Sequence, residues 1–378
     1  MNPTNRNKEI EFNKSFHSLK SKEIRKITKI LRNKVYPLIN LKMHHNSKYS
    51  EKDFLDLLTY VAMTHDFTNN GSKTFELLKE DTPASNTVIH HIKKLDPDYI
   101  EKLFMKTFDR LIKMAAKYKP FRERVDLAID ITEQMYYGDE NDSMVCETKP
   151  KNGTSHCFRY ITINVVENGK RFTLLALPMH KFTTKLEVVN KLITYAKSKV
   201  KINRIYLDRG FFSTDIIKLL NELRIKWLMP AIKRRNIKTY LDKYAGVFSK
   251  VIKYEIESHS TGERATFNLV IVDNREGRKC LFATNLDVPE QLAHYYFRWY
   301  SKRWGIETSF RVKGDFKART TSKYYSVRLF YFMWSVCLYN LWVLVSLIVA
   351  LIFYIDLKKP LITTKLFGTI LYSLEPRV

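Results

Sequence analysis

The sequence predicts an α/β fold, in which a mixed β-sheet forms the core and a helical domain precedes it. Three segments rich in β-branched and apolar residues follow one another between residues 125 and 177, and helix-like segments then alternate with strand-like ones up to residue 230. Consecutive strands followed by strands that alternate with helices are typical of a sheet with antiparallel and parallel pairs. Residues 1–120, in contrast, carry apolar residues at helical spacing.

The helical N-terminal domain contains a segment, residues 72–95, with the rhythm of a helix-turn-helix. The first helix is expected near Ser72–Lys79, and Ser85 is expected to cap the second, Asn86–Leu95. The second helix carries four cationic or titratable residues that could face DNA: His90, His91, Lys93 and Lys94. An ordinary helical hairpin with a solvated face is the alternative. Three further helices are expected over residues 20–34, 51–64 and 98–117.

The core is expected in residues 121–230, where each element follows from its own pattern. The predicted elements are strands Val125–Ile131, Phe158–Val166, Arg171–Leu177, Arg204–Leu207 and Lys226–Met229, and helices Lys185–Lys197 and Thr214–Leu223. Residues 231–286 then become β-rich again and predict an insertion with its own small sheet. Residues 287–357 should return to helices that complete the core, before a C-terminal tail over 358–378.

The charge balance favours a nucleic-acid partner. The chain has 65 Lys and Arg against 39 Asp and Glu, a net charge of +26. Residues 298–328 alone hold nine cations and two acids, a density that a uniform lysine bias would not explain. The four cysteines form no CxxC pair and the N-terminus has no apolar signal region, so we expect a reducing cytoplasm, in association with the nucleoid.

One uncharged segment, Leu329–Tyr354, is long enough to cross a bilayer, since as one helix it would span roughly 39 Å. However, Trp, Tyr and Phe occur throughout its first half, and Ser335, Asn340 and Ser346 interrupt it. These features favour one or two buried helices that close the core over a membrane anchor.

Three acidic residues are candidates for a metal site. Asp130 follows the apolar run VDLAI, and Asp208 follows RIYL, so both are expected at strand ends. Glu307 lies in a helical stretch surrounded by cations. Taken singly, each aspartate suits a turn or cap, but together the three carboxylates could bind two Mg²⁺ or Mn²⁺ ions. Asp126 is the second choice for the first position because it would point to the same sheet face from deeper in the strand.

These residues resemble a known family. The order Asp, Asp, β-rich insertion, Glu is similar to that of DDE insertion-sequence transposases, which have an RNase H-like core. Tyr300-x-x-Arg303-x-x-x-Glu307 resembles the YREK signature of the insertion-sequence-four superfamily, and AIDIT, MYYGD, YLDRGF and YNLWVLV are also similar. The signature places six residues between its Glu and Lys. Here Lys313 comes after five and Gly314 holds the expected place, so either Lys313 or Lys317 could serve.

The resemblance implies a metal-dependent DNA transposase that cuts double-stranded DNA at the element's ends and then uses the freed 3′-hydroxyl to attack another phosphodiester. Asp130, Asp208 and Glu307 would hold the two ions, and Tyr300 and Arg303 would bind phosphates. The basic residues expected to contact DNA with them are Arg298, Arg311, Lys313, Lys317, His91, Lys93 and Lys94. We expect a dimer on DNA and no small-molecule substrate. A catalytically inactive nucleic-acid-binding protein and a nuclease without strand transfer are the alternatives.

Overall fold

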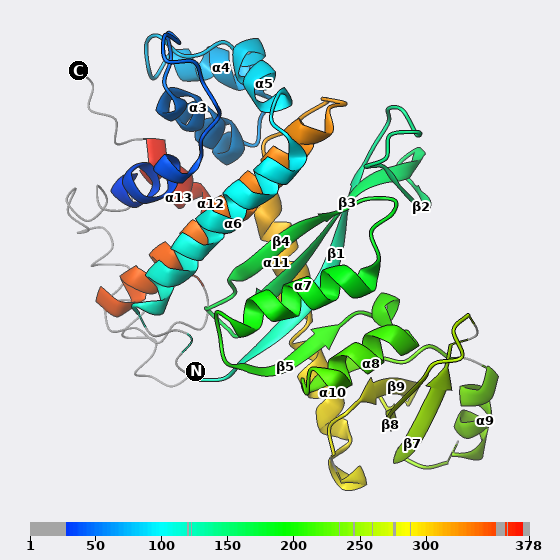
Figure 1. Ribbon diagram of the computed structural model, residues 1–378. Coiled ribbons are helices and arrows are strands. Elements are labelled where there is room, and N and C mark those ends of the chain that lie inside the picture. Colours follow the sequence, from blue (N-terminus) through cyan, green and yellow to red (C-terminus); the bar gives the residue numbers. More distant parts are fainter. Residues whose placement is uncertain are drawn as a thin grey trace. The chain divides into compact units, whose positions relative to one another are not determined.

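The computed structural model (Figure 1) describes residues 28–118, 121, 123–233, 235–244, 246–258, 260–274, 277–287, 289–352, 360 and 362–372. The first part of the expected helix 20–34 and the last two residues of the apolar segment lie outside this range. The chain divides into two compact units. The helical unit comprises Met1–Pro120, Asn168–Phe172 and Phe310–Val378, and the sheet unit comprises Phe121–Glu167 and Thr173–Ser309.

The sheet unit contains, within its described residues, one nine-stranded mixed sheet in the order β2-β3-β1-β5-β6-β9-β8-β7, with β4 also paired to β3. The strands are β1 Val125–Met135, β2 Cys146–Lys151, β3 Thr154–Val165, β4 Thr173–Met179, β5 Ile202–Leu207, β6 Trp227–Pro230, β7 Ser249–Glu257, β8 Arg264–Asp273 and β9 Lys279–Thr284. Strand β3 is antiparallel to β1 and β4, whereas β5 is parallel to β1 and β6. The predicted mixed α/β core is confirmed.

Helices in the sheet unit connect the parallel strands and lead to the candidate site. Helix α7, Lys185–Lys197, is capped by Thr184, and α8, Thr214–Glu222, is capped by Ser213, whose hydroxyl accepts a backbone N–H. The remaining helical elements are the short η3 Arg209–Phe211, α9 Arg235–Lys243, η4 Glu290–Leu292, α10 His294–Ser301 and α11 Trp304–Gly314. The last five residues of α11 belong to the helical unit.

The expectation that the insertion forms its own sheet is wrong. Strand β9 pairs antiparallel with β6, so β7–β9 extend the central sheet. Side chains reinforce this junction: the Thr284 hydroxyl donates to the Trp227 carbonyl at 2.5 Å, and the Asn285 amide donates to the Ile225 carbonyl at 2.7 Å. The edge of β6 that does not face β5 therefore pairs with β9 of the insertion, and the sheet continues through β8 and β7.

The helical unit is built from η1 Leu31–Val35, η2 Tyr36–Leu38, α3 Glu51–Thr64, α4 Thr68–Glu76, α5 Ser85–Lys93, α6 Pro97–Ala116, α12 Tyr325–Ile352 and α13 Thr364–Tyr372. Two helices, α4 and α5, occupy the region of the predicted helix-turn-helix, with differences. Helix α4 begins and ends earlier than expected, and residues 77–84 form a connection longer than the usual three or four residues. Ala84, and not Ser85, is the N-cap of α5; the Ser85 hydroxyl instead contacts the Asn69 side chain at 3.3 Å.

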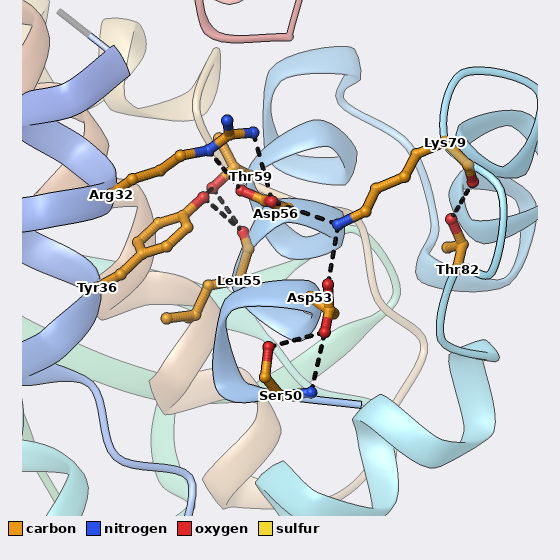
Figure 2. Close-up of polar contacts among 9 residues, drawn as sticks. All are labelled: Arg32, Tyr36, Ser50, Asp53, Leu55, Asp56, Thr59, Lys79 and Thr82. Atoms are coloured by element: carbon orange, nitrogen blue, oxygen red, sulfur yellow. Dashed lines mark hydrogen bonds and ion pairs between the residues drawn. The ribbon is translucent and has the colours of Figure 1, made fainter. Parts of the chain in front are cut away.

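A half-buried ionic network, centred on the buried Asp56, connects the loop between α4 and α5 to α3 (Figure 2). Asp56 accepts hydrogen bonds from the Arg32 guanidinium at 3.2 and 3.3 Å. The Lys79 ammonium, from the α4–α5 connection, lies 2.9 Å from Asp53 and 3.6 Å from Asp56. Asp53 also closes a capping box with Ser50 at the start of α3. The long connection is therefore held to α3 by a lysine shared between two carboxylates.

The apolar segment forms one helix, α12, which is buried in the helical unit. It lies alongside α6 (Figure 1), where the Phe104 ring packs edge-to-face on Phe330 at 5.2 Å and on Trp334 at 6.4 Å. Its length and composition alone would allow it to cross a membrane, but 83% of its most apolar window is buried inside the protein. This burial favours the core-helix interpretation, with one helix instead of two.

Candidate active site

Asp130 and Asp208 occupy neighbouring positions, Asp130 on strand β1 and Asp208 directly after the parallel strand β5. Ile129 of β1 pairs with Leu207 of β5, and the two aspartates are the next residues. Adjacent strands lie about 4.8 Å apart, so the backbones at these positions are neighbours. Strand β5 ends at Leu207, and the Asp208 carboxylate accepts the Arg209 N–H at 2.6 Å.

The expectation that Asp130 ends its strand is wrong, because β1 continues to Met135 and Asp130 pairs with Thr162 of β3. What ends at this point is the parallel pairing with β5. Antiparallel pairing with the long strand β3 therefore continues β1 past the position that the apolar alternation marks as its end.

Asp126, the second choice, is fully occupied by structural contacts. Its buried carboxylate accepts hydrogen bonds from Asn203 at 2.6 Å, Tyr206 at 2.9 Å and Lys302 at 2.8 Å, and the Arg204 guanidinium lies 3.4 Å away. Burial opposes its ionisation, but Lys302 and Arg204 hold the pKa of Asp126 below its usual value. Because both oxygens are already engaged, this carboxylate ties β1, β5 and the end of α10 together and is poorly suited to bind a metal ion.

A single guanidinium brings Asp130 and Glu307 together. Arg303 Nη1 lies 3.4 Å from Asp130 Oδ2, and its Nη2 donates to Glu307 Oε1 at 2.6 Å. The Arg303 side chain is 11% exposed and that of Asp130 14%, whereas Glu307 is 53% exposed. The Tyr300 ring lies 5.4 Å from the guanidinium, and its hydroxyl donates to the Leu207 carbonyl at 3.4 Å, directly before Asp208.

The charged form of Asp130 is disfavoured, chiefly because its carboxylate is buried. Burial raises the pKa of Asp130 to about 6; Arg303 and the Ile131 N–H oppose this rise, and the charges of Asp208 and Glu307 add to it. Burial works against the charge of Arg303, but Tyr300 and the three carboxylates raise its pKa above the usual value. The three acids therefore act on one another and on one arginine.

The donor chemistry fits a hard divalent cation, since carboxylate oxygens are the ligands that Mg²⁺ and Mn²⁺ prefer. Across the described ranges, however, no three His, Cys, Asp or Glu side chains lie close enough together to form a ready metal site. The physical reason lies in Arg303, whose guanidinium is placed between Asp130 and Glu307 and supplies the positive charge there. For the three acids to share an ion, Arg303 would have to move away.

Comparison with known proteins gives the family. The sequence model described as "Transposase DDE domain" matches residues 147–341, just over half of the chain. The chain belongs to the DDE transposase family. A piggyBac transposase, solved by cryo-electron microscopy as a synaptic complex with hairpin DNA, has a similar fold, with a TM-score of 0.59 and 12% sequence identity. That similarity covers 93% of this chain and 80% of the piggyBac chain. None of the curated proteins matches the sequence significantly.

The transposase is thus an enzyme of the polynucleotidyl transferase class, and DDE transposases as a group use divalent metal ions. Of its predicted DNA-contacting residues, Arg298, Arg311, Lys93 and Lys94 are exposed. Lys313 is 3% exposed, and its ammonium packs 4.6 Å from the Phe310 ring and 5.1 Å from the Tyr339 ring. This placement puts Lys313 away from the surface.

The other two predicted contacts are half-buried. Burial, with help from the nearby charge of Arg328, lowers the pKa of Lys317 to about 8. The His91 ring packs edge-on against Phe54 at 5.3 Å, and burial lowers its pKa. Of the two lysines that could complete the signature, Lys317 is therefore the more accessible in the transposase.

Sequence reasoning missed the role of Lys302. It lies in the cationic stretch beside Glu307, but its ammonium binds Asp126 at 2.8 Å and approaches Glu167 at 3.6 Å. This contact fixes the turn that leads directly into Arg303 and α11. The sequence shows that Lys302 is next to Arg303, but it does not show that Lys302 binds Asp126, which is 176 residues away.

Proposed function

We propose that this transposase is a member of the YREK-signature superfamily that cuts the ends of an insertion sequence and transfers the 3′-hydroxyl end to target DNA. Asp130, Asp208 and Glu307 would form its metal-binding triad. The observation that carries the proposal is the convergence of Asp130 and Glu307 on one guanidinium, with Asp208 beside Asp130 in the parallel register. The three acids occur in the order Asp, Asp, Glu. The family match covers Asp208 and Glu307 and begins after Asp130.

Two divalent ions, Mg²⁺ or Mn²⁺, would supply activation of the attacking oxygen and stabilisation of the leaving oxygen. The protein's own part begins with Arg303. This guanidinium forms ion pairs with both Asp130 and Glu307. A DNA phosphate is a bidentate partner for the same guanidinium, so Arg303 would exchange the carboxylates for the phosphate, beside Tyr300.

This exchange couples DNA binding to metal binding. When Arg303 leaves, the buried Asp130 loses its nearest cation while Asp208 and Glu307 still raise its pKa. The freed carboxylates then have a high affinity for a replacement cation. DNA and the metal ions would therefore each favour binding of the other, which restricts activity to the DNA complex.

Double-stranded DNA is the proposed partner, both as element ends and as target. The positive charge of the chain and its fold similarity to a transposase captured in a synaptic complex with hairpin DNA support this partner. Because two element ends must be joined to one target, a dimer on the DNA is the expected assembly. The proposed location is the cytoplasm, in association with the nucleoid.

The test is Mg²⁺-dependent nicking of a supercoiled plasmid by the wild type and by Glu307→Gln. We expect cleavage to fall by orders of magnitude in this variant, while DNA binding is retained or tightened because one negative charge is gone. Glu257→Gln is the matched control: Glu257 lies in the same unit, is 54% exposed, and pairs with an arginine at 3.2 Å. Cleavage at the wild-type rate in Glu307→Gln would end the assignment.

Two further readouts separate the alternatives. An inactive nucleic-acid-binding protein would bind the plasmid with no Mg²⁺-dependent nicking in the wild type. A nuclease would nick but would not join a labelled 3′ end to target DNA. Joined product that requires Glu307 supports the transposase against both.

A further inference from the structure

The segment between α11 and α12, residues 315–324, contacts the turn between α3 and α4 and the helix α5 in the helical unit. The Lys317 carbonyl lies 2.9 Å from His65 Nδ1, and the Arg319 N–H donates to the Asp66 carbonyl at 2.8 Å. Phe67 and Arg319 form a parallel β-bridge. These contacts hold the segment against the turn between α3 and α4, although more than 250 residues separate them in the sequence.

The other end of the segment reaches α5. The Lys93 ammonium lies 3.6 Å from the centroid of the Tyr324 ring, and the Arg319 guanidinium lies 5.6 Å from that of Phe67. Both rings are accessible, with Tyr324 49% and Phe67 38% exposed. Two cations thus lie over two exposed rings, one contact at the middle of the segment and one at its end next to α12.

The segment is also held from within. The Arg328 guanidinium of α12 donates to the Ser322 carbonyl at 2.6 Å, and the Tyr324 N–H donates to the Ser322 hydroxyl at 3.2 Å. The loop therefore presents its cations in a fixed arrangement, and a fixed arrangement loses less conformational entropy when a ligand binds.

The charge of this face is strongly positive. Its exposed cations are Lys93 of α5, Lys94 directly after it, and Arg319 and Lys323 of the segment. The nearest acid in the turn, Asp66, is half-buried and already accepts hydrogen bonds from the Phe67 N–H at 2.7 Å and the Asn70 amide at 2.6 Å. The segment itself carries one acid, Asp315, which accepts a hydrogen bond from the Thr364 hydroxyl at 3.2 Å.

We propose that Lys93, Lys94, Arg319, Lys323 and Tyr324 form one composite surface that binds the backbone of duplex DNA. Helix α5 would contribute one row of phosphate contacts and the segment a second row, in the manner of a helix with an adjoining wing. This inference rests on the proposed function for its ligand, and it adds a contact element that the helix-turn-helix pattern does not contain. DNA binding by the helical unit would then depend on residues that follow α11, the helix that carries Glu307.

The test is binding of the full-length protein to a fluorescent 30-base-pair duplex, in EDTA, over a range of salt concentrations. The double variant Arg319→Gln/Lys323→Gln is compared with Lys102→Gln/Lys106→Gln, two exposed lysines of α6 in the same unit. Each lost phosphate contact lowers the slope of log K against log salt by about 0.9, so the first pair should lower it by about 2. At physiological salt this corresponds to a loss of affinity of roughly 30-fold.

The control pair should change the slope by much less, because it removes the same charge from α6, which is not part of the proposed surface. Equal effects of the two pairs, or no effect of the first, would overturn the proposal. Arg319→Lys keeps the charge and should retain most of the slope, which excludes misfolding as the cause of the loss. Since the assay contains no divalent ions, the surface can be confirmed even if the plasmid-nicking test of the proposed function fails, and refuted even if that test succeeds.

Discussion

Replacement of Asp130 by asparagine should stabilise the folded protein at neutral pH in the absence of divalent ions. Burial raises the pKa of Asp130 from 3.8 to about 6, so its ionised form is disfavoured in the folded state. One pKa unit is worth 1.36 kcal/mol, which makes this penalty about 3 kcal/mol at pH 7.5. Asparagine keeps an oxygen that can accept the Ile131 N–H, seen at 2.9 Å, and removes the charge.

The gain should shrink as the pH falls. Between the two pKa values the folded state binds more protons than the unfolded state, so wild-type stability decreases as pH rises through this window. The difference between variant and wild type is therefore about 3 kcal/mol at pH 7.5, about 1.6 kcal/mol at pH 5 and about 0.6 kcal/mol at pH 4. Urea unfolding of both proteins at these three pH values, in EDTA, measures it.

Asp126→Asn is the matched control, since it makes the same substitution four residues earlier on the same strand. The pKa of Asp126 is lowered, chiefly by Lys302 and Arg204 against the effect of burial, so its charge stabilises the fold above pH 3.8 and this stabilisation is lost as the pH falls. The substitution should cost about 3–5 kcal/mol at pH 7.5, because it leaves the largely buried Arg204 guanidinium and the half-buried Lys302 ammonium without the charge of Asp126. If Asp130→Asn is destabilising at pH 7.5 to a similar extent, burial does not disfavour the charged form of Asp130 as described.

Three further outcomes are expected. Arg303→Met should raise the Mn²⁺ affinity of the DNA-free protein by about tenfold or more in calorimetric titration, whereas Arg303→Lys should not, because the competing cation between Asp130 and Glu307 is lost only in the first. Lys317→Met should raise the unfolding free energy at pH 7, and the gain should vanish as the pH rises from about 8 through 10.5, since burial lowers the pKa of Lys317 to about 8; an unchanged pH profile would contradict this. Phe104→Ala should cost about 3–5 kcal/mol in chemical denaturation, because it leaves a cavity against Phe330 and Trp334; a cost below about 1 kcal/mol would show that α6 and α12 do not pack as described.

The elements that the sequence predicts well are those whose limits are set locally. Helices 51–64 and 185–197 have the predicted bounds. Each has apolar residues at helical spacing, and a capping residue, Ser50 or Thr184, directly precedes it. The sheet order is different. Pairing of Leu228 with Thr284 joins the insertion to the core, and nothing near either residue encodes the other.

The candidate site shows the same limit more sharply. Asp126 and Asp130 are the same residue type, four positions apart on one strand, and the sequence separates them only by the end of an apolar alternation. That criterion favoured Asp130, although β1 does not end there. What separates them physically is their distant partners: Asp126 is saturated by Asn203, Tyr206 and Lys302, whereas Asp130 shares a single guanidinium with Glu307.

The lone glutamate of the cationic stretch is explained in the same terms. A glutamate four residues after an arginine on a helix is a common surface pair of small energy. Here the arginine is buried and also reaches Asp130, so the pair links α11 to the sheet position beside Asp208. The guanidinium holds the largely buried Asp130 and the exposed Glu307 on one positive charge, although the two acids repel one another. In the proposed function, a DNA phosphate would replace Asp130 and Glu307 as the partner of this guanidinium, so that the acids would become accessible to divalent ions when DNA binds.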